Sequence, residues 1–194
     1  MLIQSALVVV SILFALWVDE WSEDQDFQEL AERSLVSFER EIEQNKRRLE
    51  AMTPFHIGLR DVVGTMTADG GTTSLSTFRN IIDGFEPAIL VNTAWETGVA
   101  TGAVSHMEYD IVAGLSLTYG IQDRLNALNS SGLSDLLRGG LGSSEMEMLL
   151  YAASRYLREL AEEEQQLQLV YGQILELLRA RNGEAPESET DSGA

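Results

Sequence analysis

The chain has no cysteine and few basic residues, and both shortages exclude classes of function. Without cysteine it forms no disulfides, has no thiol chemistry, cannot bind zinc or iron–sulfur clusters through thiolates, and carries no lipidated cysteine. With 13 basic against 31 acidic residues, its formal net charge is -18. So acidic a chain is poorly suited to nucleic acid or to anionic lipid headgroups. We therefore expect no nucleic-acid partner, and we expect charged partners to be basic proteins or cations.

Sequence motifs of common catalytic sites are also missing. The sequence has no nucleophile elbow, phosphate-binding loop, zinc-protease motif or Glu-x-x-His pair. Its two histidines, His56 and His106, have no local ligand spacing, so a metal site would need both to converge with a carboxylate. We predict no catalytic residues, no metal and no cofactor. A metal-dependent hydrolase is the least favoured alternative.

One long apolar run stands out against this acidic background. Residues 2–18 (LIQSALVVVSILFALWV) contain no charge and are followed by acidic residues over 19–26. As a helix this run spans about 26 Å, close to the thickness of the bilayer hydrocarbon. Trp17 and Trp21 lie where interfacial aromatic residues are expected. The sequence therefore predicts a single transmembrane helix over residues 1–18, with the lipid bilayer as a partner.

A cleaved signal peptide and a buried helix of a soluble domain are the alternatives for this run. A signal peptide needs basic residues before the run and small residues at its end, whereas the bulky residues 16–18 precede the acids. A soluble helix would carry a polar stripe, but Gln4, Ser5 and Ser11 form no continuous face. Both alternatives are less favoured than a membrane span.

The orientation of this span follows from the distribution of basic residues. Nothing basic precedes the run, and Arg33 is the first basic residue after it. Because the cytoplasmic side of a membrane protein is usually enriched in Lys and Arg, this scarcity favours placing the bulk of the chain outside the cytoplasm.

Residues 19–52 predict a long amphipathic helix that continues from the apolar run. The segment has no proline or glycine, and Pro54 favours an end just before it, because the residue before a proline is pushed out of the α region. Asn45 is the one polar residue at an inward position. An intramolecular bundle and a homo-oligomeric coiled coil with Asn45 setting its register both fit this pattern. The apolar positions, at helical spacing, are Phe27, Ala31, Leu35, Phe38, Ile42, Leu49 and Met52.

A second long helix is predicted over residues 144–181. It opens with a capping box at 144–147 (SEME), and Gly183 provides a C-terminal stop. The two long helices are of similar length and can pair antiparallel. We therefore predict an all-α fold with one transmembrane helix that continues into an elongated antiparallel helical bundle at 19–183. The acidic stretch 184–194 is predicted to be a flexible tail.

The segments between the long helices are less regular. Residues 55–66 predict a short helix, 67–76 a loop, and 77–85 a short helix or an extended edge. The glycine-rich stretch 130–143 predicts a flexible connection.

Two capping boxes lie in the middle of the chain. The box at 93–96 (TAWE) predicts a short helix that ends near Gly102. The box at 105–108 (SHME) predicts a helix from His106 to about Leu128.

Aromatic and polar residues gather around these two boxes. Glu96 and Glu108 are explained by capping, and His106 is expected at the exposed start of a helix. Tyr109 with Trp95 would pack the short helix against the bundle. We interpret the group as an interaction or structural cluster rather than an active site. It comprises Trp95, Glu96, His106, Tyr109 and Asp110.

Several of these segments together resemble an uncharacterised bacterial family of single-pass, membrane-anchored helical proteins. The segments are LWVDEW at 16–21, TAWET at 93–97, GAVS at 102–105 and MEYD at 107–110. The resemblance extends to about Tyr119. It implies bacterial origin and an anchored helical architecture, and it assigns no catalytic residue. With the orientation inferred above from the basic residues, we expect a bacterial inner-membrane protein with most of the chain in the periplasm.

These features favour a non-catalytic accessory or structural subunit. Its anchor and bundle would associate with other membrane proteins and stabilise a larger assembly, for example a bioenergetic or light-harvesting complex. A homo-oligomer is a further expected mode of association. The alternative from another class is an extracytoplasmic helical module that senses a ligand.

Overall fold

The computed structural model describes residues 2–68, 76–78, 80, 84–138, 146–181 and 183. All regular secondary structure in these ranges is helical, which confirms the predicted all-α class. The elements are α1 (Leu2–Ala68), α3 (Thr93–Ala100), the 3-10 helix η1 (Ala103–His106), α4 (Tyr109–Arg138) and α5 (Met146–Arg181). Within these ranges, the side chains at 2–13, 15–16, 18–20, 23, 131–138 and 146 lie outside the description.

Helix α1 runs without interruption from Leu2 to Ala68 and passes through Pro54. The predicted helix end before Pro54 and the separate helix at 55–66 are therefore wrong. Pro54 lies on the exposed side of α1, where the carbonyl of Glu50, which loses its helical donor, can bond to water. Thr53 and Val63, before and after the proline, are buried. Packing on both sides of the proline outweighs its cost of about 3 kcal/mol.

The apolar run at the start of α1 was predicted to span a membrane. In the part of the chain that the structure describes, no helix carries an apolar stretch long enough to cross a bilayer. Most side chains of residues 2–18 lie outside that part. Trp17 and Trp21 lie within it, and they are 61% and 56% exposed.

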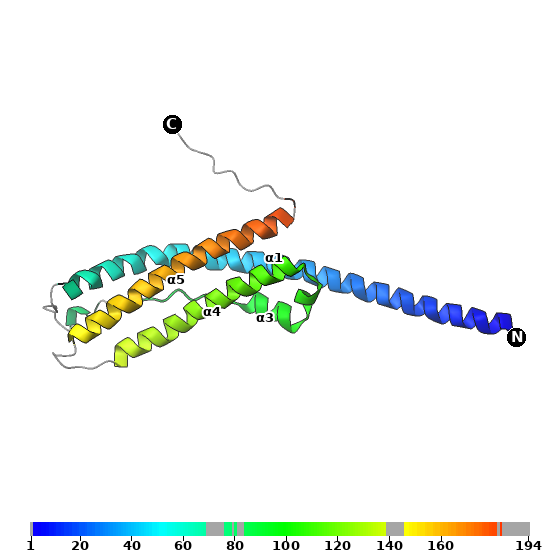
Figure 1. Ribbon diagram of the computed structural model, residues 1–194, viewed down its shortest axis with the longest axis horizontal. Helices are drawn as coiled ribbons and strands as arrows, with labels where there is room; N and C mark the ends of the chain where they lie inside the picture. The colour runs from blue at the N-terminus through cyan, green and yellow to red at the C-terminus, as the bar shows by residue number, and fades with distance from the viewer. Residues whose placement is uncertain are drawn as a thin grey trace, which may run out of the picture.

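The bundle consists of α4, α5 and the part of α1 from about residue 31 onward (Figure 1). Helix α5 lies antiparallel to both α1 and α4, and its most extensive contacts are with α1. The predicted antiparallel pairing of the two long helices is confirmed. The N-terminal part of α1 projects beyond the other helices (Figure 1), and Ala31 is the first residue of α1 that the structure describes as buried. We call residues 2–30 the N-terminal extension.

The core follows the predicted apolar stripes of the two long helices. On α1 the stripe is buried from Ala31 to Leu49, whereas Phe27 on the N-terminal extension is 38% exposed. On α5 the stripe is buried from Leu149 to Leu178, with Val170 partly buried. The spacing that predicted the helices therefore also predicted which faces are buried.

Residues 84–92 form an extended segment that runs along the bundle beside the helices (Figure 1). Phe85, Ala88 and Leu90 point into the core, and Ile89 is exposed. In the region predicted as a short helix or an edge, residues 76–78 and 80 are helical. The loop predicted at 67–76 starts after α1 ends at Ala68, and most of it lies outside the described residues.

The predicted short helices exist, but their ends differ from the predictions. Helix α3 ends at Ala100, and Gly102 adopts a positive φ of 76° before η1 begins. Helix α4 starts at Tyr109 rather than His106, and it continues to Arg138 instead of ending near Leu128. The predicted flexible connection is therefore helical over residues 130–138, and its remainder lies outside the described residues.

The predicted helix caps have mixed outcomes. Helix α3 is preceded by Asn92, whose side chain makes no capping hydrogen bond, and Ser105 lies inside η1. These two capping boxes are wrong, and Ser144 of the third lies outside the described residues, as does the tail at 184–194. The glycine stop of α5 is confirmed, because Gly183 has a φ of 74° and donates to the Ala180 carbonyl at 3.2 Å.

Candidate functional site

The bundle core contains a row of buried polar side chains, which is the most distinctive chemical feature of the fold. Buried polar groups are costly unless they form hydrogen bonds, so each of them needs a partner inside the bundle. We call this set the buried polar row. It comprises Glu41, Asn45, Thr53 and His56 on α1, Thr118, Gln122 and Asn129 on α4, and Glu164 on α5.

Much of the buried polar row bonds to the backbone of the extended segment 84–92. Asn45 donates through Nδ2 to the Val91 carbonyl at 2.7 Å, and the Val91 N–H donates to Asn45 Oδ1 at 3.1 Å. Gln122 donates through Nε2 to the same carbonyl at 2.9 Å. The amide side chain of Asn45 thus replaces a neighbouring strand at Val91. Further carbonyls accept hydrogen bonds from Asn129 (to Ala88), Arg48 (to Ile89) and Asn126 (to Leu90).

The same amide groups also connect the three long helices. Gln122 Oε1 on α4 accepts from Asn45 Nδ2 on α1 at 3.0 Å and from the Tyr171 hydroxyl on α5 at 2.5 Å. Burial raises the pKa of Tyr171, so its hydroxyl stays protonated and keeps donating. Since the hydrogen-bond partners of Asn45 lie in its own chain, the structure favours the intramolecular bundle over a coiled coil in which Asn45 pairs between chains.

Glu41 supplies the cap that α3 lacks locally. Its Oε2 accepts from the Ala94 N–H at 2.8 Å, and its Oε1 accepts from the Tyr119 hydroxyl at 2.8 Å. A carboxylate at a helix N-terminus is favourable because it interacts with free N–H groups and the helix dipole. Burial and the adjacent Glu41 carboxylate raise the pKa of Tyr119. The cap predicted from Thr93 is thus provided by a residue far upstream in sequence.

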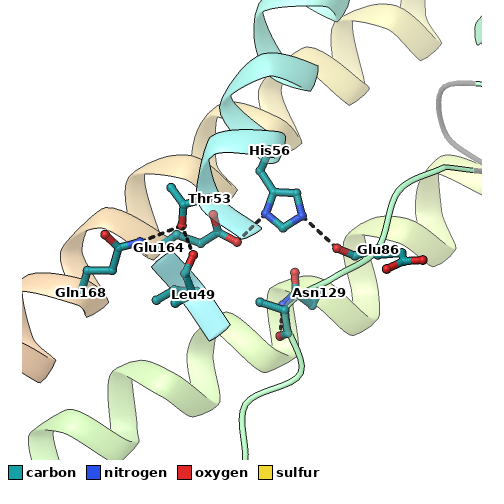
Figure 2. A network of polar contacts seen from close by, with 8 residues as sticks. Leu49, Thr53, His56, Glu86, Asn129, Glu164 and Gln168 are labelled. Atoms are coloured by element: carbon teal, nitrogen blue, oxygen red, sulfur yellow. Dashed lines mark hydrogen bonds and ion pairs between the residues drawn. The ribbon is translucent and has the colours of Figure 1, made fainter. Parts of the chain in front are cut away.

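His56 and Glu164 form a fully buried pair between α1 and α5 (Figure 2). Nδ1 of His56 lies 2.6 Å from Glu164 Oε1, and Nε2 lies 2.9 Å from the Glu86 carbonyl oxygen. Both contacts are to acceptors, so the geometry matches an imidazolium ring that donates on both sides. Burial alone lowers the pKa of His56, but the Glu164 carboxylate and the Glu86 carbonyl together raise it above 6.5.

Hydrogen bonding around this pair is incomplete. Among the described side chains, the buried polar atoms without a partner are Glu164 Oε2, Asn129 Oδ1 and the Tyr156 hydroxyl. Burial, helped by the Glu164 carboxylate, raises the pKa of Tyr156 to about 12. Phe85 lies between the rings of His56 and Tyr156, with centroids 5.1 and 5.9 Å away. Neither His56 nor Glu164 is exposed to solvent, so the pair is placed to hold elements together rather than to meet a substrate.

The cluster predicted around the two capping boxes does not form one site. Trp95 stacks on Tyr119 with centroids 5.4 Å apart, as expected of a residue that packs α3 on the bundle. His106 is exposed and stacks on Phe27 at 4.4 Å. Tyr109 is 84% exposed, so the prediction that it packs α3 against the bundle is wrong. The exposed residues of the cluster also include Glu96 and Asp110.

The two histidines have different surroundings. His56 pairs with Glu164 in the core, whereas His106 lies on the surface beside the N-terminal extension. In the described ranges, no group of three or more His, Asp or Glu side chains is arranged to hold a metal ion.

Sequence reasoning missed most of the buried polar row, although a signal for it was present. Asn45 was recognised as a polar residue at an inward position. Glu41 lies three residues after Phe38 and His56 lies three before Leu59, so both occupy the same apolar stripe of α1. Glu164 similarly follows Leu160 by four residues on α5. The positions of these residues on the apolar stripes predicted that they are buried. Their charged side chains, which are usually found on the surface, made that prediction easy to miss.

No protein-family model, curated protein or solved structure matches this chain. The resemblance to an uncharacterised bacterial family therefore stays a prediction from the segments at 16–21 and 93–110. Function has to be inferred from the physical features of the chain itself.

The hydrogen bond to Asn45 should protect the Val91 N–H from hydrogen exchange, although Val91 lies outside any helix. Asn45→Ala should speed hydrogen exchange at the Val91 N–H and lower the free energy of unfolding by on the order of 1–3 kcal/mol, because the Val91 N–H loses its partner and the Val91 carbonyl keeps only Gln122. Asn92→Ala is the matched control, since Asn92 makes only an exposed contact to Asp123 at 3.4 Å. Equal exchange at Val91 in all three proteins would contradict the assigned role.

The His56–Glu164 pair predicts a loss of stability at alkaline pH. Because the folded pKa of His56 is raised, its stabilising contribution is present in full below about pH 6.5 and is lost as the pH rises through the folded pKa. Urea unfolding of the full chain in neutral detergent at pH 6 to 9 measures this loss. Each unit of pKa shift corresponds to about 1.4 kcal/mol.

Two variants separate this pair from other titrating groups. Glu164→Gln removes the anion, so the free energy of unfolding should fall at pH 6 and depend less on pH. His106→Gln removes the exposed histidine and should leave the pH dependence unchanged. The imidazole signals of His56 in NMR spectra should titrate above 6.5 in the wild type and below it in Glu164→Gln. A wild-type slope in Glu164→Gln would refute the assignment.

Proposed function

We propose that this chain is a membrane-anchored accessory protein whose helical bundle associates with other membrane proteins and has no catalytic role. The observation that carries the proposal is the continuity of α1. A single helix joins the uncharged apolar run at 2–18 to the core of the bundle. About 13 residues separate Val18 from Ala31, the first residue described as buried, which corresponds to roughly 20 Å of helix.

A continuous helix is a stiff connection. An anchor joined by a glycine-rich linker would leave the bundle free to tumble, whereas α1 fixes its direction relative to the apolar run. The buried polar row then fixes α4, α5 and the segment 84–92 on α1. Such a module suits a subunit that must hold a defined position beside its partners. In this arrangement the chain is a bacterial inner-membrane protein with most of its mass in the periplasm.

The surface near the N-terminal extension suits a basic partner. A cavity of about 670 Å³ lies where the extension meets η1 and the end of α5. Arg181, the one arginine in its lining, is already paired with Glu32 and Glu108. The other acidic residues of the lining, Asp26 and Glu29, are exposed. The chain has a net charge of -18. We expect the acidic surface around this cavity to attract a positively charged segment of a neighbouring subunit.

The anchor predicts how the chain distributes between membrane and soluble fractions. The wild type should stay in the membrane pellet after an alkaline wash. The double variant Val9→Arg/Leu13→Arg should leave it, because each central arginine costs on the order of 2.5–3.5 kcal/mol on insertion. Ser188→Arg/Ser192→Arg adds the same charge outside the apolar run and should be retained. Retention of the Val9/Leu13 variant would overturn the anchor.

If the acidic cavity binds the partner proteins, charge reversal in the cavity should release those proteins and leave the chain anchored in the membrane. Purification in mild detergent followed by mass spectrometry should recover a stoichiometric set of membrane proteins. Asp26→Lys/Glu29→Lys should release that set, because the cavity loses its charge complementarity. Glu147→Lys/Glu162→Lys makes the same change of charge on exposed residues of α5 and should keep it. Recovery of the chain alone in every sample would refute the accessory function.

A further inference from the structure

Basic side chains are scarce in this chain, and most of those that the structure describes already form ion pairs or hydrogen bonds within it. Ion pairs hold Lys46, Arg47, Arg124, Arg179 and others to acidic residues, and Arg48 donates to the Ile89 carbonyl. Among the described basic side chains, those with no ion pair or hydrogen bond are Arg40, Arg155 and Arg158.

Two of these three arginines line one cavity. It has a volume of about 340 Å³ and lies between the C-terminal end of α1 and the first half of α5. The lining residues follow the spacing i, i+3, i+4 on α1 and i, i+3, i+4, i+7 on α5, so each set lies on one helix face. They are Gly64, Thr67 and Ala68 on α1, and Tyr151, Ser154, Arg155 and Arg158 on α5.

The described charged residues that line this cavity are both basic, although the chain as a whole is acidic. No carboxylate is among the lining residues that the structure describes. Glu159 and Glu162 follow Arg155 and Arg158 by four residues, the spacing at which helical ion pairs form, yet neither pair forms. Two exposed guanidinium groups therefore line one cavity without an ion pair to any described carboxylate, although the chain has 31 acidic residues. A bound anion would remove their mutual repulsion.

The remaining lining matches an organic anion rather than a bare ion. Thr67 Oγ1 donates to the Val63 carbonyl at 2.8 Å and can still accept a hydrogen bond. The Ser154 hydroxyl makes no hydrogen bond with the described residues and is free to donate. Gly64, Ala68 and the ring of Tyr151 supply apolar surface. The volume lies at the small end of the range for ligand pockets, about 300–1,000 Å³.

We propose that this cavity binds a small phosphate monoester with an aromatic or apolar group. Arg155 and Arg158 bind the phosphate, Ser154 donates to it, and the apolar group lies against Tyr151. This inference goes beyond the accessory function and does not depend on it. The cavity lies at the end of the bundle opposite the N-terminal extension (Figure 1), with Gly64 roughly 70 Å along α1 from Val18. If the apolar run lies in a membrane, as proposed above, the ligand comes from the aqueous phase; binding itself does not require the anchor.

Phenyl phosphate is the probe, with the full chain in neutral detergent and a buffer low in chloride. Calorimetry should show saturable binding at one site, with inorganic phosphate binding more weakly because it lacks the apolar group. Arg155→Gln and Arg158→Gln should each weaken binding about tenfold, because each removes a charged hydrogen bond. Arg40→Gln removes an equally unpaired arginine outside this cavity and should leave the affinity unchanged.

A pair of glycine variants tests the position of the site without removing an arginine. At both Gly64 and Gly58 an added Cβ would meet no atom within 4 Å, so either position accepts a side chain. Gly64→Glu places a carboxylate in the cavity and should abolish binding, whereas Gly58→Glu adds the same charge to α1 outside it. Absence of saturable binding, or equal weakening by Arg40→Gln or Gly58→Glu, would overturn the proposal.

Discussion

The fold depends on side-chain hydrogen bonds to the backbone of one extended segment, residues 84–92, that lies inside a helical bundle. Helices satisfy their own peptide groups, but residues 84–92 have neither a helix nor a neighbouring strand to bond with. Side chains of α1 and α4 replace that strand, with Asn45 bonding both peptide groups of Val91. The buried polar row is therefore the counterpart of the segment. Neither is stable in the core without the other, and together they specify how α1, α4 and α5 are aligned.

The same requirement explains why charged residues lie in the core. Glu41 bonds the first turn of α3 immediately after the extended segment, and His56 bonds the Glu86 carbonyl near its beginning. A buried carboxylate or imidazolium is costly, and its cost is offset only when each polar atom has a partner. Glu41 meets this condition with both oxygens. Glu164 meets it with one, so the charge of the pair is incompletely compensated at the end of the bundle around His56.

The sequence predicted the helices and their buried faces because these depend on local periodicity. It mispredicted the features set by distant residues. Pro54 satisfies the local rule for a helix end, but packing on both sides keeps α1 intact. The capping box at Thr93 also satisfies a local rule, yet Glu41 performs the capping from another helix. At the candidate site, Asn45 was recognised because an amide on an apolar stripe is conspicuous. Glu164 lies within a run of three glutamates, which is usually a solvated surface.

The acidic composition and the placement of the arginines have a common physical basis. A chain with a net charge of -18 repels itself, and its few basic residues are most useful where they connect helices across acidic faces. Arg179 connects α5 to Glu39 and Glu43 of α1, and Arg181 connects α5 to Glu32 of α1. Because acidic residues are abundant in this chain, an arginine could readily form a stabilising ion pair. An arginine without a partner lacks that stabilisation. Two such arginines facing one cavity are therefore better explained by an external anion than by the folding of the bundle.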